Sequence, residues 1–337
     1  MINASVMANL EVFQGSHQKK EESMKKLLFI LVAVSLVFAA ASATAQAKGP
    51  IKIAMVNLAL TSPYFIGMSQ AVKQECDRFT NIKLVTTDAK GDAQKLTSDI
   101  EDVLAQNVNG LIISAAWLEA APEALDAIKK AGVPVVLVDR KLKGGDYTSW
   151  VGPDNTRIGI QDGDYIVKRL NGKGRVVVLR GGPADNSIGL DRTNGMISSV
   201  KKAGMEVVMA PNFGGWSSDG GFKLMEDMLA KYKKIDAVFA ENDSMALGAQ
   251  KAIADAGRSN EMFLCGADGE KAALVEISKK ANFAATGLNS SDQIGRAGFT
   301  RLMSLLAGAQ SEKDTILPSP LITIDNVARF LIPESVF

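Results

Sequence analysis

The sequence predicts an α/β protein in which parallel sheets are built in two similar halves. Apolar runs of strand length alternate with segments of helical period to the end of the chain. Strands this apolar are covered on both faces, and their alternation with helices makes neighbouring strands parallel. Two segments also share one pattern, "IKKAGVPVVLVD" from Ile128 and "VKKAGMEVVMAP" from Val200, which supports two halves of similar construction.

The first 47 residues are expected to lie outside this fold. Residues 24–47 begin with two lysines, continue through an apolar run and end on small residues. This pattern is typical of a secretory signal peptide, cleaved here near Ala47. A transmembrane anchor is the alternative, but the apolar core is short for a bilayer of ~30 Å. Residues 1–23 show no periodicity and are interpreted as an upstream extension.

Length and charge narrow the class of the exported chain. Removing 47 of the 337 residues leaves 290, enough for about two domains of ~150 residues. This part carries 34 basic and 34 acidic side chains, so it lacks the positive field that nucleic acid or an anionic membrane requires. We therefore expect no nucleic-acid partner.

Side-chain types exclude several chemistries. The only histidine, His17, lies in the leader, which removes Ser-His-Asp mechanisms and His-ligated metal sites from the mature chain. Neither a P-loop nor a dinucleotide fingerprint is present, so no cofactor is expected. The residues after the strands include no cluster of carboxylates for a cation, so no metal is expected either. Cys76 and Cys265 fall in different halves. A disulfide between them is the alternative to the two free, buried thiols that we expect.

Nine segments have the length and apolar character of strands, with helical patterns such as "EALDAIKKAG" between most of them. In both copies of the repeated pattern, paired lysines meet the negative end of the helix dipole, and a glycine follows that favours a left-handed cap. The segment "GGDYTSWVGPDNTRIG" contains a short β-like run and is expected to be the first crossing between the halves. The predicted strands are 51–57, 82–88, 110–115, 134–139, 175–180, 206–210, 237–242, 262–268 and 283–288.

The residues that follow the strands are the candidate site, because ligands of open parallel sheets bind beyond the carboxyl ends of the strands. After the first strand, Ser62 is placed to cap a helix, Pro63 suits its first turn, and Tyr64 and Phe65 project from that turn. Later strand ends and the loops after them add Trp117, Asp139, Arg140, Arg192, Trp216, Asn242, Asp268 and Asn289.

These residue types suit a polyhydroxylated neutral ligand. Planar rings cover the apolar C–H face of a sugar, while Asp, Asn and Arg offer acceptors and donors to its hydroxyls. Each residue also has a purely structural interpretation. The aromatic pair could form a hydrophobic staple, Trp216 could anchor its loop, and the asparagines could be turn or cap residues. For the adjacent Asp139 and Arg140, a ligand contact is favoured over a solvated pair and over catalysis.

Six motifs in order, "IAMVNLALTSPYF", "VVLVDR", "LDRTNGM", "VFAENDSMALGA", "GADGE" and "DQIG", resemble the type I periplasmic sugar-binding proteins, above all the ribose-binding branch. The resemblance implies two doubly wound parallel-sheet lobes, joined by a three-segment hinge, that close around a ligand in the cleft. The N-terminal lobe would hold residues 48–153 and 290–318, and the C-terminal lobe residues 154–289 and 319–337. Tyr64, Phe65 and Trp216 would sandwich the sugar. Its hydroxyls would be bound by Asp139, Arg140, Arg192, Asn242, Asp268 and Asn289.

The sequence departs from the ribose-binding pattern at several of these positions. Ser62 and Asn289 stand where that branch has asparagine and glutamine, and Ala267 stands where it has phenylalanine. Asn57 and Leu58 alter the end of the first strand. Since several changes shorten a side chain, we expect a roomier site that takes a pentose, hexose or polyol other than ribose. Asn57, Ser62 and Trp117 complete the predicted ligand-binding set.

The resemblance implies a periplasmic, monomeric substrate-binding protein of an ABC sugar importer, with an inner-membrane permease as partner, and not an enzyme. A ligand carrier for a chemoreceptor is an alternative that uses the same fold. A sugar-sensing regulator would need a helix-turn-helix where the signal peptide stands. A glycosidase would need a raised pKa at Asp139 or Asp268, whereas Arg140 and Arg192 are expected to keep Asp139 ionised.

Overall fold

Two six-stranded sheets organise the protein, in a computed structural model that describes residues 49–114, 118–142, 147–183, 187–310, 312–332 and 337. Residues 51–337 form one compact unit. The strand order is β11-β5-β4-β3-β1-β2 in the first sheet and β12-β10-β9-β8-β6-β7 in the second. All pairs are parallel except β10 with β12. The predicted class of two parallel-sheet lobes is confirmed.

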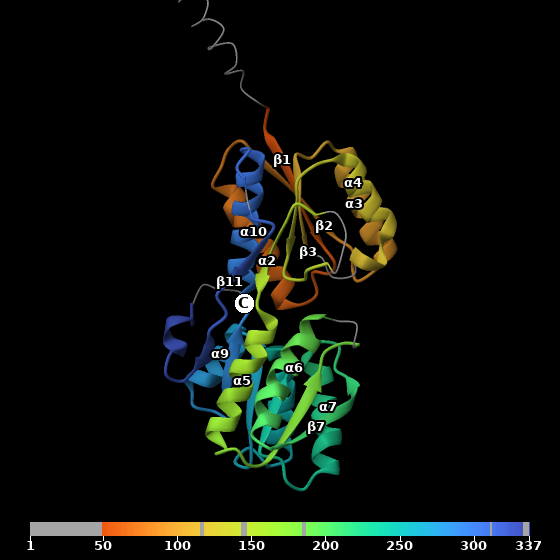
Figure 1. The fold of residues 1–337 in the computed structure, drawn as a ribbon. Coiled ribbons are helices and arrows are strands. Elements are labelled where there is room, and N and C mark those ends of the chain that lie inside the picture. The colour runs from red at the N-terminus through yellow and green to blue at the C-terminus, as the bar shows by residue number, and fades with distance from the viewer. Residues whose placement is uncertain (1–48, 115–117, 143–146, 184–186, 311, 333–336) are drawn as a thin grey trace, which may run out of the picture. The chain divides into compact units, whose positions relative to one another are not determined.

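The first sheet and its helices form what is called here the first lobe. Its strands are β1 (Ile51–Asn57), β2 (Ile82–Asp88), β3 (Gly110–Ser114), β4 (Val135–Val138), β5 (Ser149–Pro153) and β11 (Asp314–Leu317). On one face lie α2 (Pro63–Asp77) and α10 (Ser291–Leu306). The other face is covered by α3 (Ala93–Ala105) and α4 (Pro122–Ala131), with the short η1 (Leu118–Ala120) before α4 (Figure 1).

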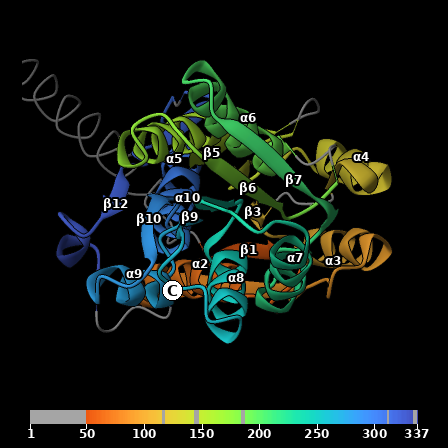
Figure 2. The ribbon, with the colours of Figure 1, turned by 90° about the horizontal axis from the view of Figure 1, so that it is seen from below.

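The second sheet and its helices form the second lobe. Its strands are β6 (Arg175–Arg180), β7 (Glu206–Phe213), β8 (Ala237–Ala240), β9 (Phe263–Asp268), β10 (Phe283–Leu288) and β12 (Leu321–Thr323). Figure 2 shows α5 (Asn155–Arg169) and α6 (Ser187–Lys202) on the face opposite α7 (Ser218–Lys231) and α8 (Asp243–Asp255). The remaining helices are α9 (Lys271–Ser278) and η2 (Val327–Arg329).

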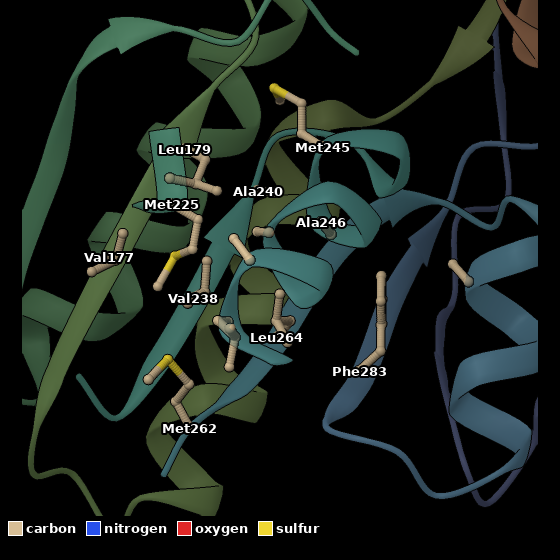
Figure 3. Packing of buried hydrophobic residues seen from close by; sticks show 14 of the residues in the cluster. Val177, Leu179, Met225, Val238, Ala240, Met245, Ala246, Met262, Leu264 and Phe283 are labelled. Carbon is tan, nitrogen blue, oxygen red and sulfur yellow. The ribbon is translucent and has the colours of Figure 1, made fainter. Parts of the chain in front are cut away.

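The core of the second lobe shows why these strands are apolar on both faces. Val177, Val238 and Leu264, on three adjacent strands, pack against Met225 of α7 and Ala246 of α8 (Figure 3). All five side chains are fully buried. Successive strand residues point to opposite faces, so the residues between them pack on α5 and α6.

Most predicted strands are present, with differences at their ends. β4 and β8 end earlier than expected because the polar residues Asp139 and Glu241 follow their last apolar positions, and β7 continues to Phe213. The β-like run of the first crossing is β5. β11 and β12 were not predicted, since four and three residues are too few for a periodic signal. The repeated glycine caps are present: Gly132 has φ 64° and Gly204 has φ 76°.

The chain passes between the sheets three times, after β5, after β10 and after β11. The lobe boundaries expected from the sequence stay a prediction. The ring centroid of Phe337 lies 5.3 Å from that of Tyr64 in the first lobe. Cys76 and Cys265 are free and buried, as expected. Within the described ranges, no helix is long and apolar enough to cross a membrane.

Candidate functional site

A cavity of about 640 Å³ lies at the carboxyl ends of the strands, with walls from both lobes. Its position follows from topology, because the loops after parallel strands converge at one edge of each sheet. The first lobe contributes Leu58, Thr61, Ser62, Pro63, Tyr64, Phe65, Asp139 and Arg140. The other residues of the lining are Ile188, Arg192, Gly215, Trp216, Ser217, Ser218, Asn242, Ser244, Asp268, Glu270, Asn289 and Phe337.

The N-terminus of α2 places two aromatic rings on the cavity wall. Ser62 is the N-cap of this helix and its side chain accepts a hydrogen bond from the backbone N–H of Phe65, while Pro63 occupies the first turn. The rings of Tyr64 and Phe65 meet edge to face, with centroids 5.4 Å apart. The Ser62 hydroxyl thus has the capping role that the sequence predicts, and it also lines the cavity.

Asp139 turns into the cavity because the backbone leaves the extended conformation at the end of β4. Its φ is 67°, in the left-handed region that few non-glycine residues adopt. The indole N–H of Trp150 donates to the Asp139 carbonyl at 3.1 Å and holds this turn. Its carboxylate Oδ1 accepts a hydrogen bond of 2.7 Å from the Tyr64 hydroxyl. Arg140 follows directly and also lines the cavity.

Asp268 and Asn289 stand at the ends of the neighbouring strands β9 and β10. The Asn289 backbone N–H donates to the Asp268 carbonyl at 3.0 Å, and its Nδ2 donates to Asp268 Oδ1 at 3.1 Å. The same Nδ2 also donates to the Tyr64 hydroxyl at 2.9 Å. Side chains from both lobes are therefore joined at this end of the cavity.

Arg192 is only 1% exposed, and three neighbouring residues hold its guanidinium group. Its Nε donates to Asn155 Oδ1 at 2.9 Å, and its Nη1 donates to the Glu241 carbonyl at 2.7 Å. Nη1 also pairs with Asp268 Oδ1 at 2.9 Å. Burial alone would lower the pKa of Arg192, but the carboxylates of Asp268 and Asp139 raise it above its usual value. The guanidinium is therefore charged and fixed in orientation.

Burial dominates the titration of Asp268. It raises the pKa of this carboxyl to about 6, against the lowering influence of Arg192 and of the hydrogen bond from Asn289. Glu270, two residues further along, is also raised in pKa by burial, while a hydrogen bond from Ser244 opposes the change. The Ser244 hydroxyl donates to Glu270 Oε2 at 2.7 Å. This wall therefore carries two carboxyl groups that bind protons more readily than exposed ones.

Trp216 is placed by close packing of its loop. Its φ is 60°, and a Cβ added at Gly181 would lie 2.3 Å from its indole ring, so only glycine leaves room for the ring there. Asn242 supports this loop from the N-cap of α8. Its Oδ1 accepts from the backbone N–H of Met245 at 3.0 Å, and its Nδ2 donates to the Trp216 carbonyl at 3.1 Å. Asn242 itself lines the cavity.

Ten of the twelve residues predicted to bind ligand line this cavity. Asn57 is not among the lining residues. It is fully buried beside the strand end, where its Nδ2 donates to the Thr87 carbonyl at 3.0 Å. Trp117 lies outside the described residues. Sequence reasoning missed Glu270 and Ser244, although both stand within two residues of predicted members, Asp268 and Asn242. It also missed Phe337, which no strand-end rule points to.

Within the described ranges, no group of three or more histidine, cysteine, aspartate or glutamate residues is arranged to hold a metal ion. The residues that line the cavity combine aromatic and aliphatic side chains with carboxylate, amide and guanidinium groups. Such a combination can bind an uncharged molecule that has both hydroxyl groups and apolar C–H faces.

Comparison with known proteins gives consistent matches. A family model described as periplasmic binding protein domain matches residues 53–310. The ribose import binding protein of Salmonella typhimurium is 32% identical over 85% of this chain and 94% of its own. The xylitol-binding protein of Mycolicibacterium smegmatis is 29% identical over 73% of this chain and 70% of its own. A solute binding protein of an ABC transporter from Mycobacterium smegmatis, solved with bound glycerol, has a TM-score of 0.79 at 26% identity and covers 85% of this chain and 99% of its own.

Proposed function

The chain belongs to the periplasmic binding protein family, and from this premise we propose that it is the substrate-binding protein of an ABC importer for a monosaccharide or polyol. The observation that carries the proposal is the cavity between the lobes, where aromatic rings and charged or amide groups converge. Relatives named for ribose, allose and xylitol support this ligand class. A permease in the inner membrane would receive the sugar.

The mechanism of ligand binding follows from the fact that both lobes contribute residues to the cavity wall. Asp139 and Arg140 belong to the first lobe, whereas Arg192, Asn242 and Asp268 belong to the second. A ligand that contacts both sets stabilises the closed arrangement, and it shifts the hinge equilibrium by its difference in affinity for the two states. Buried polar groups also give selectivity, because a ligand lacking a matching hydroxyl leaves them unpaired at ~1–3 kcal/mol each.

Periplasmic location follows from the family, and we propose that residues 24–47 direct the export and are removed near Ala47. The mass of the exported protein would report the cleavage point. Delivery of the bound ligand to a chemoreceptor is a further role that the same closed form would serve.

An enzyme of the glycosidase kind is the second candidate, since the pKa of Asp268 is raised to about 6, as a general acid requires. Binding ranks first for two reasons. The relatives are binding proteins, and both Asp139 and Asp268 accept hydrogen bonds from protein groups that keep them in fixed positions. Unchanged sugar after long incubation with the protein would favour binding, and released product would favour catalysis.

Calorimetric titration with a panel of neutral pentoses, hexoses and polyols tests the proposal. We expect saturable binding of at least one member at one site per chain, with a ligand other than ribose as the tightest. Asp139→Ala should remove measurable binding without unfolding the protein. Asp164→Ala, an exposed position on α5, is the matched control and should bind as the native protein does. If no panel member binds, the proposed ligand class is wrong, and if ribose binds most tightly, the expected selectivity is wrong.

A further inference from the structure

The hydroxyl of Tyr64 already occupies the space between two predicted hydroxyl-binding groups. It donates to Asp139 Oδ1 at 2.7 Å and accepts from Asn289 Nδ2 at 2.9 Å. Asn289 Nδ2 lies only 3.5 Å from Asp139 Oδ1, so both groups converge on the position that the phenol oxygen fills. The phenol oxygen donates one hydrogen bond and accepts another, and a sugar hydroxyl at the same place would do the same.

The Tyr64 side chain is fixed in this position by its surroundings. Ser62 caps the helix that carries it, and the rings of Phe65 and Phe337 contact it edge to face at 5.4 Å and 5.3 Å. Burial, and next the charge of Asp139, raise the pKa of Tyr64 well above its usual value. The phenol therefore stays protonated at physiological pH and donates a hydrogen bond to Asp139.

Other acceptors at this end of the cavity stay available for a ligand. Among the described residues, the carboxylates of Asp139 and Asp268 accept their side-chain hydrogen bonds on Oδ1. The Oδ2 atom of each remains to accept a hydrogen bond from a ligand. The apolar lining of the same cavity includes Leu58, Ile188 and Phe337. A ligand with several hydroxyls and one apolar edge matches these groups.

We propose, on the premise that the cavity binds a sugar, that Tyr64 is a specificity-determining residue whose hydroxyl replaces one ligand hydroxyl between Asp139 and Asn289. The favoured ligand then carries a hydrogen or a methyl group at that position, as a deoxy sugar does. A ligand hydroxyl brought there would lose its water and find Asp139 Oδ1 and Asn289 Nδ2 already paired. A buried hydroxyl without a partner is costly, and the fully hydroxylated sugar is disfavoured for that reason.

The variant Tyr64→Phe tests this role, because it removes the hydroxyl and keeps the ring. Tyr147→Phe is the matched control, since the Tyr147 hydroxyl donates to Asp314 Oδ1 at 3.3 Å, outside the cavity lining. Native protein and both variants would be titrated with three pairs of sugars. The pairs are D-galactose with D-fucose, L-mannose with L-rhamnose, and D-ribose with deoxyribose, and the second member of each lacks one hydroxyl.

In at least one pair, the native protein should bind the deoxy member at least as tightly as its parent. Tyr64→Phe should shift the ratio of the two affinities toward the parent by about tenfold, because Asp139 and Asn289 can then form hydrogen bonds with the additional hydroxyl of the parent sugar. Tyr147→Phe should leave the ratio unchanged. Thermal unfolding of ligand-free Tyr64→Phe checks that the variant is folded.

Two outcomes would overturn the inference while the proposed function stands. In the first, the native protein prefers the parent in every pair that binds and Tyr64→Phe leaves the ratios unchanged. In the second, a polyol of the larger panel binds but none of the six sugars does. Failure of every sugar and polyol to bind the native protein contradicts the proposed function itself, and the inference with it.

Discussion

At the scale of single residues, Asp268 shows how burial and pairing oppose each other on one carboxyl group. The residue is 7% exposed and bonded to both Arg192 and Asn289, yet its pKa is raised to about 6 because burial outweighs these partners. A folded-state pKa above the unfolded value means that Asp268 stabilises the fold at low pH. This contribution is lost as the pH rises through about 6.

Sugar binding should have the opposite dependence on pH. The ionised carboxylate accepts hydrogen bonds on both oxygens and attracts Arg192, whereas the protonated acid loses an acceptor. We expect affinity to be constant above about pH 7 and to fall roughly tenfold by about pH 5. Titration calorimetry across this range checks the prediction.

Asp268→Asn provides the control for that pH profile, because it keeps the shape of the side chain and cannot ionise. Its affinity should be weaker and nearly independent of pH between about 5 and 7. A native profile that stays flat over the same range would show that Asp268 is ionised throughout or does not contact the ligand.

At the scale of secondary-structure elements, glycines set how closely the helices of the second lobe cross. A Cβ at Gly159 of α5 would lie 1.9 Å from the Arg192 carbonyl oxygen of α6, and one at Gly195 would lie 2.3 Å from the Thr156 carbonyl oxygen. Each helix therefore presents a glycine to the backbone of the other. Since α6 carries Arg192 into the cavity, this crossing also decides where the guanidinium lies.

Gly159→Ala should separate the two helices. We expect a loss of ~1–3 kcal/mol in the free energy of unfolding from overpacking, together with weaker sugar binding as Arg192 moves from Asp268. Denaturant unfolding and calorimetric titration measure the two effects. Asp164→Ala on the exposed face of α5 should change the stability by less than ~0.5 kcal/mol. Unchanged binding by Gly159→Ala would show that the crossing does not position Arg192.

At the scale of the whole molecule, three connections join two sheets that each have their own core. At the cavity, the hydrogen bond from Asn289 to the hydroxyl of Tyr64, whose ring packs against the core of the first lobe, links the two lobes. Such a construction allows the lobes to move about the connections while each core stays packed.

A saturating ligand should therefore both stabilise the protein and make it more compact. At a free concentration of about 100 times Kd, the free energy of unfolding should rise by about 2.7 kcal/mol. Small-angle scattering should show a smaller radius of gyration with ligand than without. Asp139→Ala treated with the same sugar should show neither change. Stabilisation with an unchanged radius would mean that binding does not involve closure of the lobes.

Much of the fold was predictable because its signals are local. The segments of β1, β2, β6 and β10 are mostly apolar and of strand length, and their predicted bounds agree with the structure. The short strands β11 and β12 were not predictable, because each depends on a neighbour that is distant in sequence. For the site, the strand-end rule led to ten of the residues on the cavity wall. The rule also pointed to Asn57, the last residue of β1, which is fully buried beside Thr87 and is not among the lining residues.

The sequence by itself determined the alternation of strands and helices, the polar residues at the carboxyl ends of the strands, and the absence of histidine from residues 48–337. Only the tertiary structure decided how those polar residues pair. Tyr64 lies 75 residues from Asp139 and 225 from Asn289, and its hydroxyl bonds to both. The physical reason is that periodicity and capping act between neighbours along the chain. The partners of a side chain at a strand end are instead set by which strands lie side by side and how the lobes face each other.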